Sequence, residues 1–223
     1  FRGTNDGEWY GNAETICLPD STEAQKNAVA YFDKVIEEEC LGHDMTINVT
    51  GHSNGGNKTA TVLLESKYGG IINQAVSFDG EGFSRERIDG LKNNVGTKEY
   101  NNRINKLIGV NGENDFVNEL GERVVSSDNN FYVTTLTSND EFNPGGYHDI
   151  YYMFIAGYDK NGKPILKENL QYTEQKEVGK LVSRINKKLM KLPMAERLQA
   201  AYTIMALMEV SGDIKYNGLY GDY

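Results

Sequence analysis

The sequence is poor in cysteine, with Cys17 and Cys40 as its only two. A helix that we predict between them, over residues 22–39, would span about 27 Å. Because the Cα atoms of a disulfide lie within about 7 Å of one another, we predict that the two thiols are not bridged. The cysteines therefore give no indication of the redox compartment.

Positive charge and long apolar runs are also scarce. Lys and Arg number 23 against 32 Asp and Glu, which gives a net charge of −9. Phosphate binding requires clustered basic side chains, so nucleic acid is excluded as an expected partner. No stretch reaches the apolar length of a membrane span, and we expect no transmembrane segment. Hydrophobic residues at 39% and charged residues at 25% are typical of a soluble globular protein.

An initiator methionine is absent, since the chain begins at Phe1. We expect an upstream part, with any signal peptide, to be missing. The 223 residues suffice for one α/β domain with a sizeable core, whereas two domains would be cramped. We therefore predict a single, N-terminally incomplete domain over residues 1–223, in which 173–223 form a C-terminal helical extension.

The most informative stretch is Gly51–Gly56, with the sequence GHSNGG, which fits the G-x-S-x-G elbow that holds a nucleophilic serine between a strand and a helix. Residues 45–50 alternate apolar with polar as a strand does, and residues 59–68 continue as a helix. Glycines are needed at such a turn because backbones approach closely there. This context favours Ser53 as a nucleophile over an ordinary glycine-rich turn.

The rest of the chain alternates predicted helices and strands, as expected of an α/β fold. Further strands are predicted over 71–78, 107–110 and 131–136, and a polar helical stretch over 85–106. Segments 151–158 and 164–172 flank an Asn-Gly turn and predict a hairpin. Two helices are expected to follow, over 174–191 and 195–210.

A nucleophilic serine requires a general base, usually an imidazole, and an acid that orients it. Of the three histidines, His43 precedes the wrong end of the nucleophile strand, and the side chain of His52 should point away from Ser53. His148 follows the last predicted core strand, as the chain order serine, acid, histidine requires. We therefore predict His148 as the base.

The acid should lie between the serine and the base, at the carboxyl end of a strand. Asp115 follows the strand over 107–110 and is our prediction. Asp79, at the end of the preceding strand, is the first alternative, and Glu113 shares the loop of Asp115.

Ester hydrolysis also requires backbone N–H groups that stabilise the developing oxyanion, each worth roughly 3 kcal/mol. The residue after the nucleophile supplies one donor, which predicts Asn54. The second should come from an earlier turn, for which Thr4 is our candidate. Trp9 and Tyr10 lie in a segment that we expect to be irregular, where they either form a lid or substrate-binding surface or pack on the domain edge.

Four motifs in order resemble the class 3 lipases of the α/β-hydrolase superfamily, and more narrowly a bacterial lipase-like group. Residues 1–4 (FRGT) resemble the oxyanion strand and turn, and residues 51–56 resemble the elbow usually written GHSLGG. Residues 114–117 (NDFV) are similar to the acid motif, and residues 147–149 (YHD) to the histidine motif.

This resemblance implies a mostly parallel central sheet with helices on both faces, a lid after the oxyanion turn, and hydrolysis of acylglycerols, phospholipids or smaller esters without metal or cofactor. Asn54 replaces the usual Leu, and the segment expected to form the lid, around residues 5–8, is short and polar. We therefore expect short or moderately polar acyl esters as substrates. The resemblance also implies a bacterial protein, either cytoplasmic or secreted.

The sequence favours a serine esterase or lipase that acts through Ser53, His148 and Asp115. A phospholipase or an acyltransferase would use the same residues. An inactive lipase-like binding module is the alternative from another class, suggested by the long terminal helices and the aromatic tail.

Overall fold

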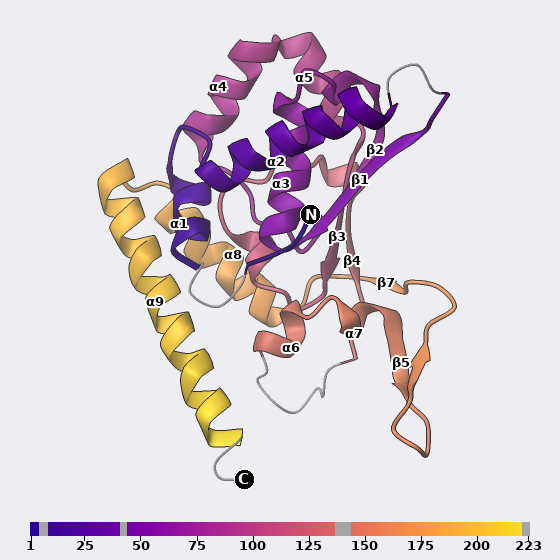
Figure 1. The fold of residues 1–223 in the computed structure, drawn as a ribbon. Helices are drawn as coiled ribbons and strands as arrows, with labels where there is room; N and C mark the ends of the chain where they lie inside the picture. Colours follow the sequence, from indigo (N-terminus) through magenta and orange to yellow (C-terminus); the bar gives the residue numbers. More distant parts are fainter. Residues whose placement is uncertain (5–8, 41–43, 137–143, 220–223) are drawn as a thin grey trace.

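The computed structural model describes residues 1–4, 9–40, 44–136 and 144–219, with the backbone alone at Cys40, at Pro144 and beyond Ala206. A five-stranded sheet lies at its centre in the order β1-β2-β3-β4-β7, and a separate hairpin pairs β5 with β6 (Figure 1). The strands are β1 Ile47–His52, β2 Ile72–Phe78, β3 Leu107–Gly112, β4 Asn130–Val133, β5 Ile155–Tyr158, β6 Pro164–Leu166 and β7 Tyr172–Thr173.

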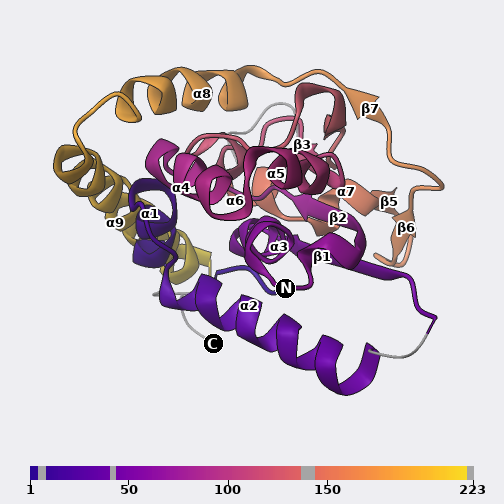
Figure 2. The same ribbon diagram turned by 90° about the horizontal axis from the view of Figure 1, so that it is seen from above.

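Strands β1 to β4 are parallel neighbours, and β7 is added to β4 in the antiparallel direction. Helices flank the sheet, and α2 and α8 lie on opposite sides of the molecule in Figure 2. The predicted α/β class with a mostly parallel sheet and a C-terminal hairpin is thereby confirmed.

The α-helices are α1 Trp9–Cys17, α2 Glu23–Val35, α3 Asn54–Glu65, α4 Arg85–Val95, α5 Thr97–Ile104, α6 Pro144–His148, α7 Tyr151–Phe154, α8 Glu177–Leu189 and α9 Met194–Leu219. A π-helical turn, Ile36–Cys40, prolongs α2, and short 3-10 turns cover Gly69–Ile71, Val117–Glu119 and Ser127–Asn129. None of the helices in the described ranges is both long enough and apolar enough to cross a bilayer.

The main core lies between the sheet and the helices α2 to α5. Helix α2 begins with a capping box, in which the Thr22 side chain and the Gln25 side chain each bond to the other's backbone N–H. Its buried face then meets α3, which packs against β1 and β2. The apolar side chains of these helices are buried against the parallel strands. Their burial holds the carboxyl ends of β1, β2 and β3 in register.

A second apolar cluster joins the two ends of the chain. Ala13, Ile16 and Cys17 of α1 pack with Ala201 and Met205 of α9. Cys17 is a free, buried thiol. The C-terminal helix thus lies against the N-terminal helix, as Figure 1 shows.

Three local predictions differ from the structure. The segment expected to be irregular after Thr4 forms α1 from Trp9 onward, because its apolar residues pack against α9. The helical stretch predicted over 85–106 is two helices, since Gly96 has a φ of 81° and interrupts the helical path. The hairpin begins with a short helix, α7, before β5. The predicted polar lid over 5–8 lies outside the described residues.

Candidate active site

Ser53 occupies a sharp turn between β1 and α3. Its φ and ψ are 59° and −131°, a backbone conformation that non-glycine residues rarely adopt and that stores strain. The turn is held because the Ser53 N–H donates to the carbonyl of Phe78 at 2.9 Å, and its own carbonyl accepts from Gly56 at 2.8 Å. Strand β1 therefore delivers Ser53 to the carboxyl edge of the sheet.

The glycines of the elbow are required by packing. A Cβ on Gly51 would lie 2.1 Å from the carbonyl oxygen of Gly55, and one on Gly55 would lie 2.2 Å from that of Phe1. These are backbone atoms, which cannot move aside as a side chain can. The close approach of residues 1–3 to the elbow thus explains the spacing of glycine around Ser53.

The structure brings Ser53, His148 and Asp115 into one hydrogen-bonded chain. His148 Nδ1 donates to Asp115 Oδ1 at 2.7 Å, and His148 Nε2 accepts from Ser53 Oγ at 2.8 Å. The residues come from the end of β1, the loop after β3 and the short helix α6. Asp115 is fully buried, whereas 13% of the His148 side chain is exposed. This geometry orients a basic imidazole nitrogen toward a serine hydroxyl.

The Asp115 carboxylate is held firmly from its other side. Its Oδ2 accepts from the backbone N–H of Asn118 at 2.8 Å and from the Asn118 side-chain amide at 2.7 Å. With His148, three donors point at this carboxylate, which fixes its position.

Neither of the two alternative acids is hydrogen-bonded to His148. Asp79 Oδ1 accepts from the N–H of Gly112 at 2.7 Å, and Asp79 Oδ2 faces His52 Nε2 at 3.8 Å. Burial, followed by the charge of Asp115, raises the pKa of Asp79 well above its usual range. Glu113 forms an ion pair with Lys176 at 3.0 Å. Of the three carboxyl groups, Asp115 is the one bonded to His148 Nδ1.

His52 lies closer to the site than the sequence suggested. Its ring stacks on that of His148 with centroids 4.7 Å apart, and its Nε2 donates to the backbone carbonyl of His148 at 2.8 Å. Burial, and then the charge of His148, lower the pKa of His52 to about 4, so the ring is neutral at pH 7. Its position next to Ser53 in the sequence does not predict this contact with α6, which depends on the tertiary fold.

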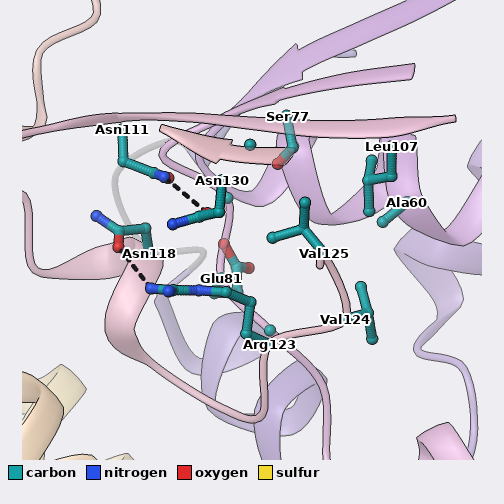
Figure 3. A pocket seen from close by; sticks show the side chains of 14 residues that line it. Ala60, Ser77, Glu81, Leu107, Asn111, Asn118, Arg123, Val124, Val125 and Asn130 are labelled. Atoms are coloured by element: carbon teal, nitrogen blue, oxygen red, sulfur yellow. Dashed lines mark hydrogen bonds between the residues drawn. The ribbon is translucent and has the colours of Figure 1, made fainter. Parts of the chain in front are cut away.

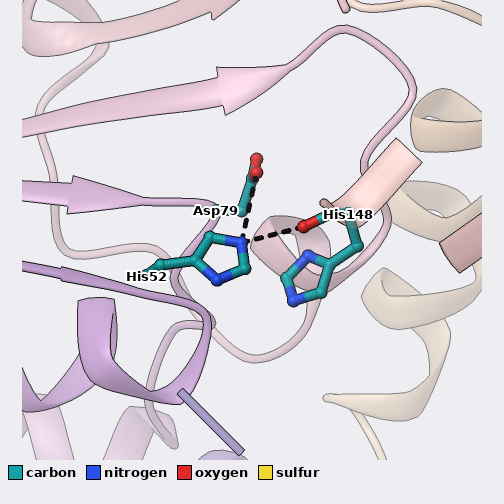
Figure 4. A group of neighbouring side chains, drawn as sticks. All are labelled: His52, Asp79 and His148. Atoms are coloured by element: carbon teal, nitrogen blue, oxygen red, sulfur yellow. Dashed lines mark hydrogen bonds and ion pairs between the residues drawn. The ribbon is translucent and has the colours of Figure 1, made fainter. Parts of the chain in front are cut away.

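His52, Asp79 and His148 form the one cluster in the described residues whose atoms are close enough to ligate a metal, within 4.8 Å of one another (Figure 4). Three of the four ring nitrogens already have partners: His52 Nε2 bonds the His148 carbonyl, and His148 uses both of its nitrogens. A metal ion in this cluster would therefore have to displace hydrogen bonds of the Ser53–His148–Asp115 chain.

The two predicted oxyanion residues flank the serine. Asn54 is the first residue of α3, where backbone N–H groups have no partner inside the helix. Its side chain donates to Glu81 Oε1 at 2.7 Å. The segment that carries Thr4 passes against the elbow, since a Cβ on Gly3 would lie 3.1 Å from Ser53 Cβ. The Thr4 hydroxyl is anchored by the amide of Asn12 at 3.0 Å.

Trp9 and Tyr10 lie in α1 and contact α9. Trp9 is partly buried against the cluster that contains Met205, and the Tyr10 ring lies 5.6 Å from that of Tyr202. Tyr10 is 44% exposed. Their predicted role as a lid or substrate-binding surface stays a prediction.

A small cavity of about 30 Å³ is lined by residues of α3, β2 and β3 and of the loop over 118–125 (Figure 3). Glu81, Asn118 and Arg123 line it, whereas Ser53 and His148 do not. Burial raises the pKa of Glu81, whose Oε2 has no partner in the described part of the chain. The cavity has room for about one ordered water and is too small for an acyl chain.

Comparison with known proteins identifies the family. No curated protein and no solved structure gives a significant match. A family model described as Mbeg1-like matches residues 1–128, which include the elbow and Asp115 and end before His148. The match covers more than half of the chain, and we conclude that the chain belongs to the Mbeg1-like family, a lipase-like family related to the α/β-hydrolases.

Proposed function

We propose that the protein is a serine hydrolase that cleaves carboxylic esters, related to the class 3 lipases within the α/β-hydrolases. The observation that carries the proposal is the continuous chain from Ser53 Oγ through His148 to Asp115, with contacts of 2.8 and 2.7 Å. The family membership supports the same class of reaction.

In the proposed mechanism, Ser53 Oγ attacks the ester carbonyl carbon while His148 Nε2 takes the hydroxyl proton. The imidazolium, stabilised by Asp115, then gives this proton to the leaving alcohol, and an acyl-enzyme forms. Water, deprotonated by His148, releases the carboxylic acid and restores the serine. The N–H groups of Asn54 and Thr4 are the proposed oxyanion donors.

Turnover of p-nitrophenyl esters of graded acyl length tests the proposal, with Ser53→Ala beside the wild type. We expect hydrolysis by the wild type, best with short or moderately polar acyl groups, and a loss of at least about 10³-fold in kcat for the variant. Ser127→Ala is a matched control, since Ser127 is exposed on the surface.

Covalent labelling by a fluorophosphonate provides a second readout. The wild type and Ser127→Ala should be labelled, and Ser53→Ala should not. No turnover together with no labelling of the folded wild type would refute the proposal and favour the inactive binding module. Transfer of the acyl group to an added alcohol, or activity restricted to phospholipids, would instead identify the acyltransferase or the phospholipase.

A further inference from the structure

Two buried carboxyl groups meet behind His148. Asp79 and Asp115 are both 0% exposed and follow the neighbouring parallel strands β2 and β3. The electrostatics of Asp79 are dominated, after burial, by the Asp115 side chain, which lies close enough to share a proton with it. Because two carboxylates in contact and away from water repel strongly, such a pair holds one proton between them.

The hydrogen-bond donors around the pair indicate which group carries the proton. Asp115 receives three, from the Asn118 backbone, the Asn118 amide and His148. Asp79 receives one, from the N–H of Gly112. The oxygens of Asp115 already accept three hydrogen bonds, whereas Asp79 Oδ2 has no donor, so the proton of the pair belongs on Asp79.

The second oxygen of Asp79 agrees with this assignment. Asp79 Oδ2 is buried and accepts no hydrogen bond from the described residues. The side chain that faces it from β1 is His52, whose Nε2 lies 3.8 Å away and donates instead to the His148 carbonyl. An O–H on Asp79 Oδ2 removes the unsatisfied acceptor, since it donates to Asp115.

We propose that Asp79 is a positioning residue whose carboxyl O–H donates a hydrogen bond to Asp115. Its Oδ1 holds the end of β3 through Gly112, and its O–H holds the Asp115 carboxylate at the distance that His148 requires. The titratable groups that face Asp79 are His52, Asp115 and His148. This inference rests on the proposed catalytic role of Ser53, His148 and Asp115.

The variants Asp79→Asn and Asp79→Ala test whether Asp79 acts as a hydrogen-bond donor or as an ionised carboxylate. Asparagine keeps an oxygen for the Gly112 N–H and replaces the O–H with an N–H donor to Asp115. We expect Asp79→Asn to retain kcat within about threefold and to keep the wild-type pH profile. Asp79→Ala should lower kcat/KM by about 10- to 100-fold and move the acid limb of the profile to higher pH, because Asp115 then favours the imidazolium more strongly.

Loss of activity in Asp79→Asn equal to that in Asp79→Ala would overturn the inference, since it would make Asp79 an ionised acid. Wild-type rates and profiles in both variants would also overturn it. The melting temperature of each variant is measured in parallel, so that a folding defect is recognised.

An infrared measurement tests the proton without reference to turnover. The difference spectrum of wild type minus Asp79→Asn at pH 7 should contain the carbonyl stretch of a protonated carboxylic acid. A carboxylate band in its place would refute the proton on Asp79. If the wild type showed this acid band but neither turnover nor labelling of Ser53, the proposed function would fail while the protonation of Asp79 held.

Discussion

Gly51 is the residue at which the elbow is most sensitive to size. A Cβ there would lie 2.1 Å from the backbone oxygen of Gly55. We expect Gly51→Ala to lower the free energy of unfolding by about 3 kcal/mol or more, since overpacking against backbone forces the turn apart. Urea unfolding measures the change. The control is Gly90→Ala in α4, where a Cβ meets nothing within 4 Å and should stabilise the helix by about 0.5–1 kcal/mol.

His52 makes the free energy of unfolding depend on pH. Its pKa is lowered from 6.5 to about 4, so the folded state binds fewer protons than the unfolded state between these values. The resulting stability is present above pH 6.5 and is lost as the pH falls toward 4, with a slope of at most about 1.4 kcal/mol per unit.

Replacement of His52 by glutamine, which can still donate to the His148 carbonyl, should remove this part of the pH dependence. The measurement is the difference in unfolding free energy between wild type and His52→Gln from pH 7 to pH 4. Buried Asp79 and Glu81 act in the opposite direction in both proteins and cancel in the difference. Parallel curves for the two proteins would contradict the assignment of His52 as a neutral donor.

At the scale of elements, the amide of Asn186 joins α8 to the loop between Asp115 and β4. The Asn186 side chain accepts from the N–H of Gly121 at 3.0 Å and donates to its carbonyl at 2.8 Å. Gly121 has a φ of 75°, a conformation that favours glycine, and belongs to the loop between Asp115 and β4. The position of this loop therefore depends on α8.

We expect Asn186→Ala to cost roughly 2–4 kcal/mol, because it leaves a buried N–H and a buried carbonyl without partners. Thermal or urea unfolding measures this cost. Lys187→Ala, at an exposed neighbouring position of the same helix, should change stability by less than about 0.5 kcal/mol. Equal effects of the two substitutions would show that Asn186 does not anchor α8.

At the scale of the whole molecule, α1 near the start of the sequence packs against α9 near its end. The buried Arg197 donates to the carbonyl of Cys17 and to Glu86, both at 2.9 Å, and Met205 packs in the same region. From these contacts we expect the described residues to unfold as one cooperative unit.

Trp9 is the only tryptophan and lies in this contact, which makes its fluorescence a local probe. If the unit is cooperative, unfolding followed by Trp9 fluorescence and by far-ultraviolet circular dichroism should coincide. Met205→Ala should shift both transitions together, at a cost of about 2–5 kcal/mol. An earlier fluorescence transition would show that α1 and α9 detach before the sheet unfolds.

Local sequence patterns predicted most of the regular elements. The strands that became β1, β2 and β3 were placed within two residues at each end, because alternation and β-branched residues act over short distances. Local patterns do not predict helix α1, because it is stabilised by long-range contacts. Its packing partner α9 lies at the other end of the chain. Strand β7 likewise owes its place beside β4 to a contact across about forty residues.

The sequence by itself determined the strand–glycine–helix turn at Ser53 and the order in which a serine, a carboxyl group and an imidazole follow one another, because these depend on neighbouring residues and chain direction. Only the tertiary structure decided that Asp115, and not Asp79, meets His148, and that His52 bonds the His148 backbone. Both carboxyl groups end parallel strands, so local pattern treats them alike. Which one meets the imidazole depends on how the loops after β3 and β4 fold back over the sheet, and long-range packing sets that geometry.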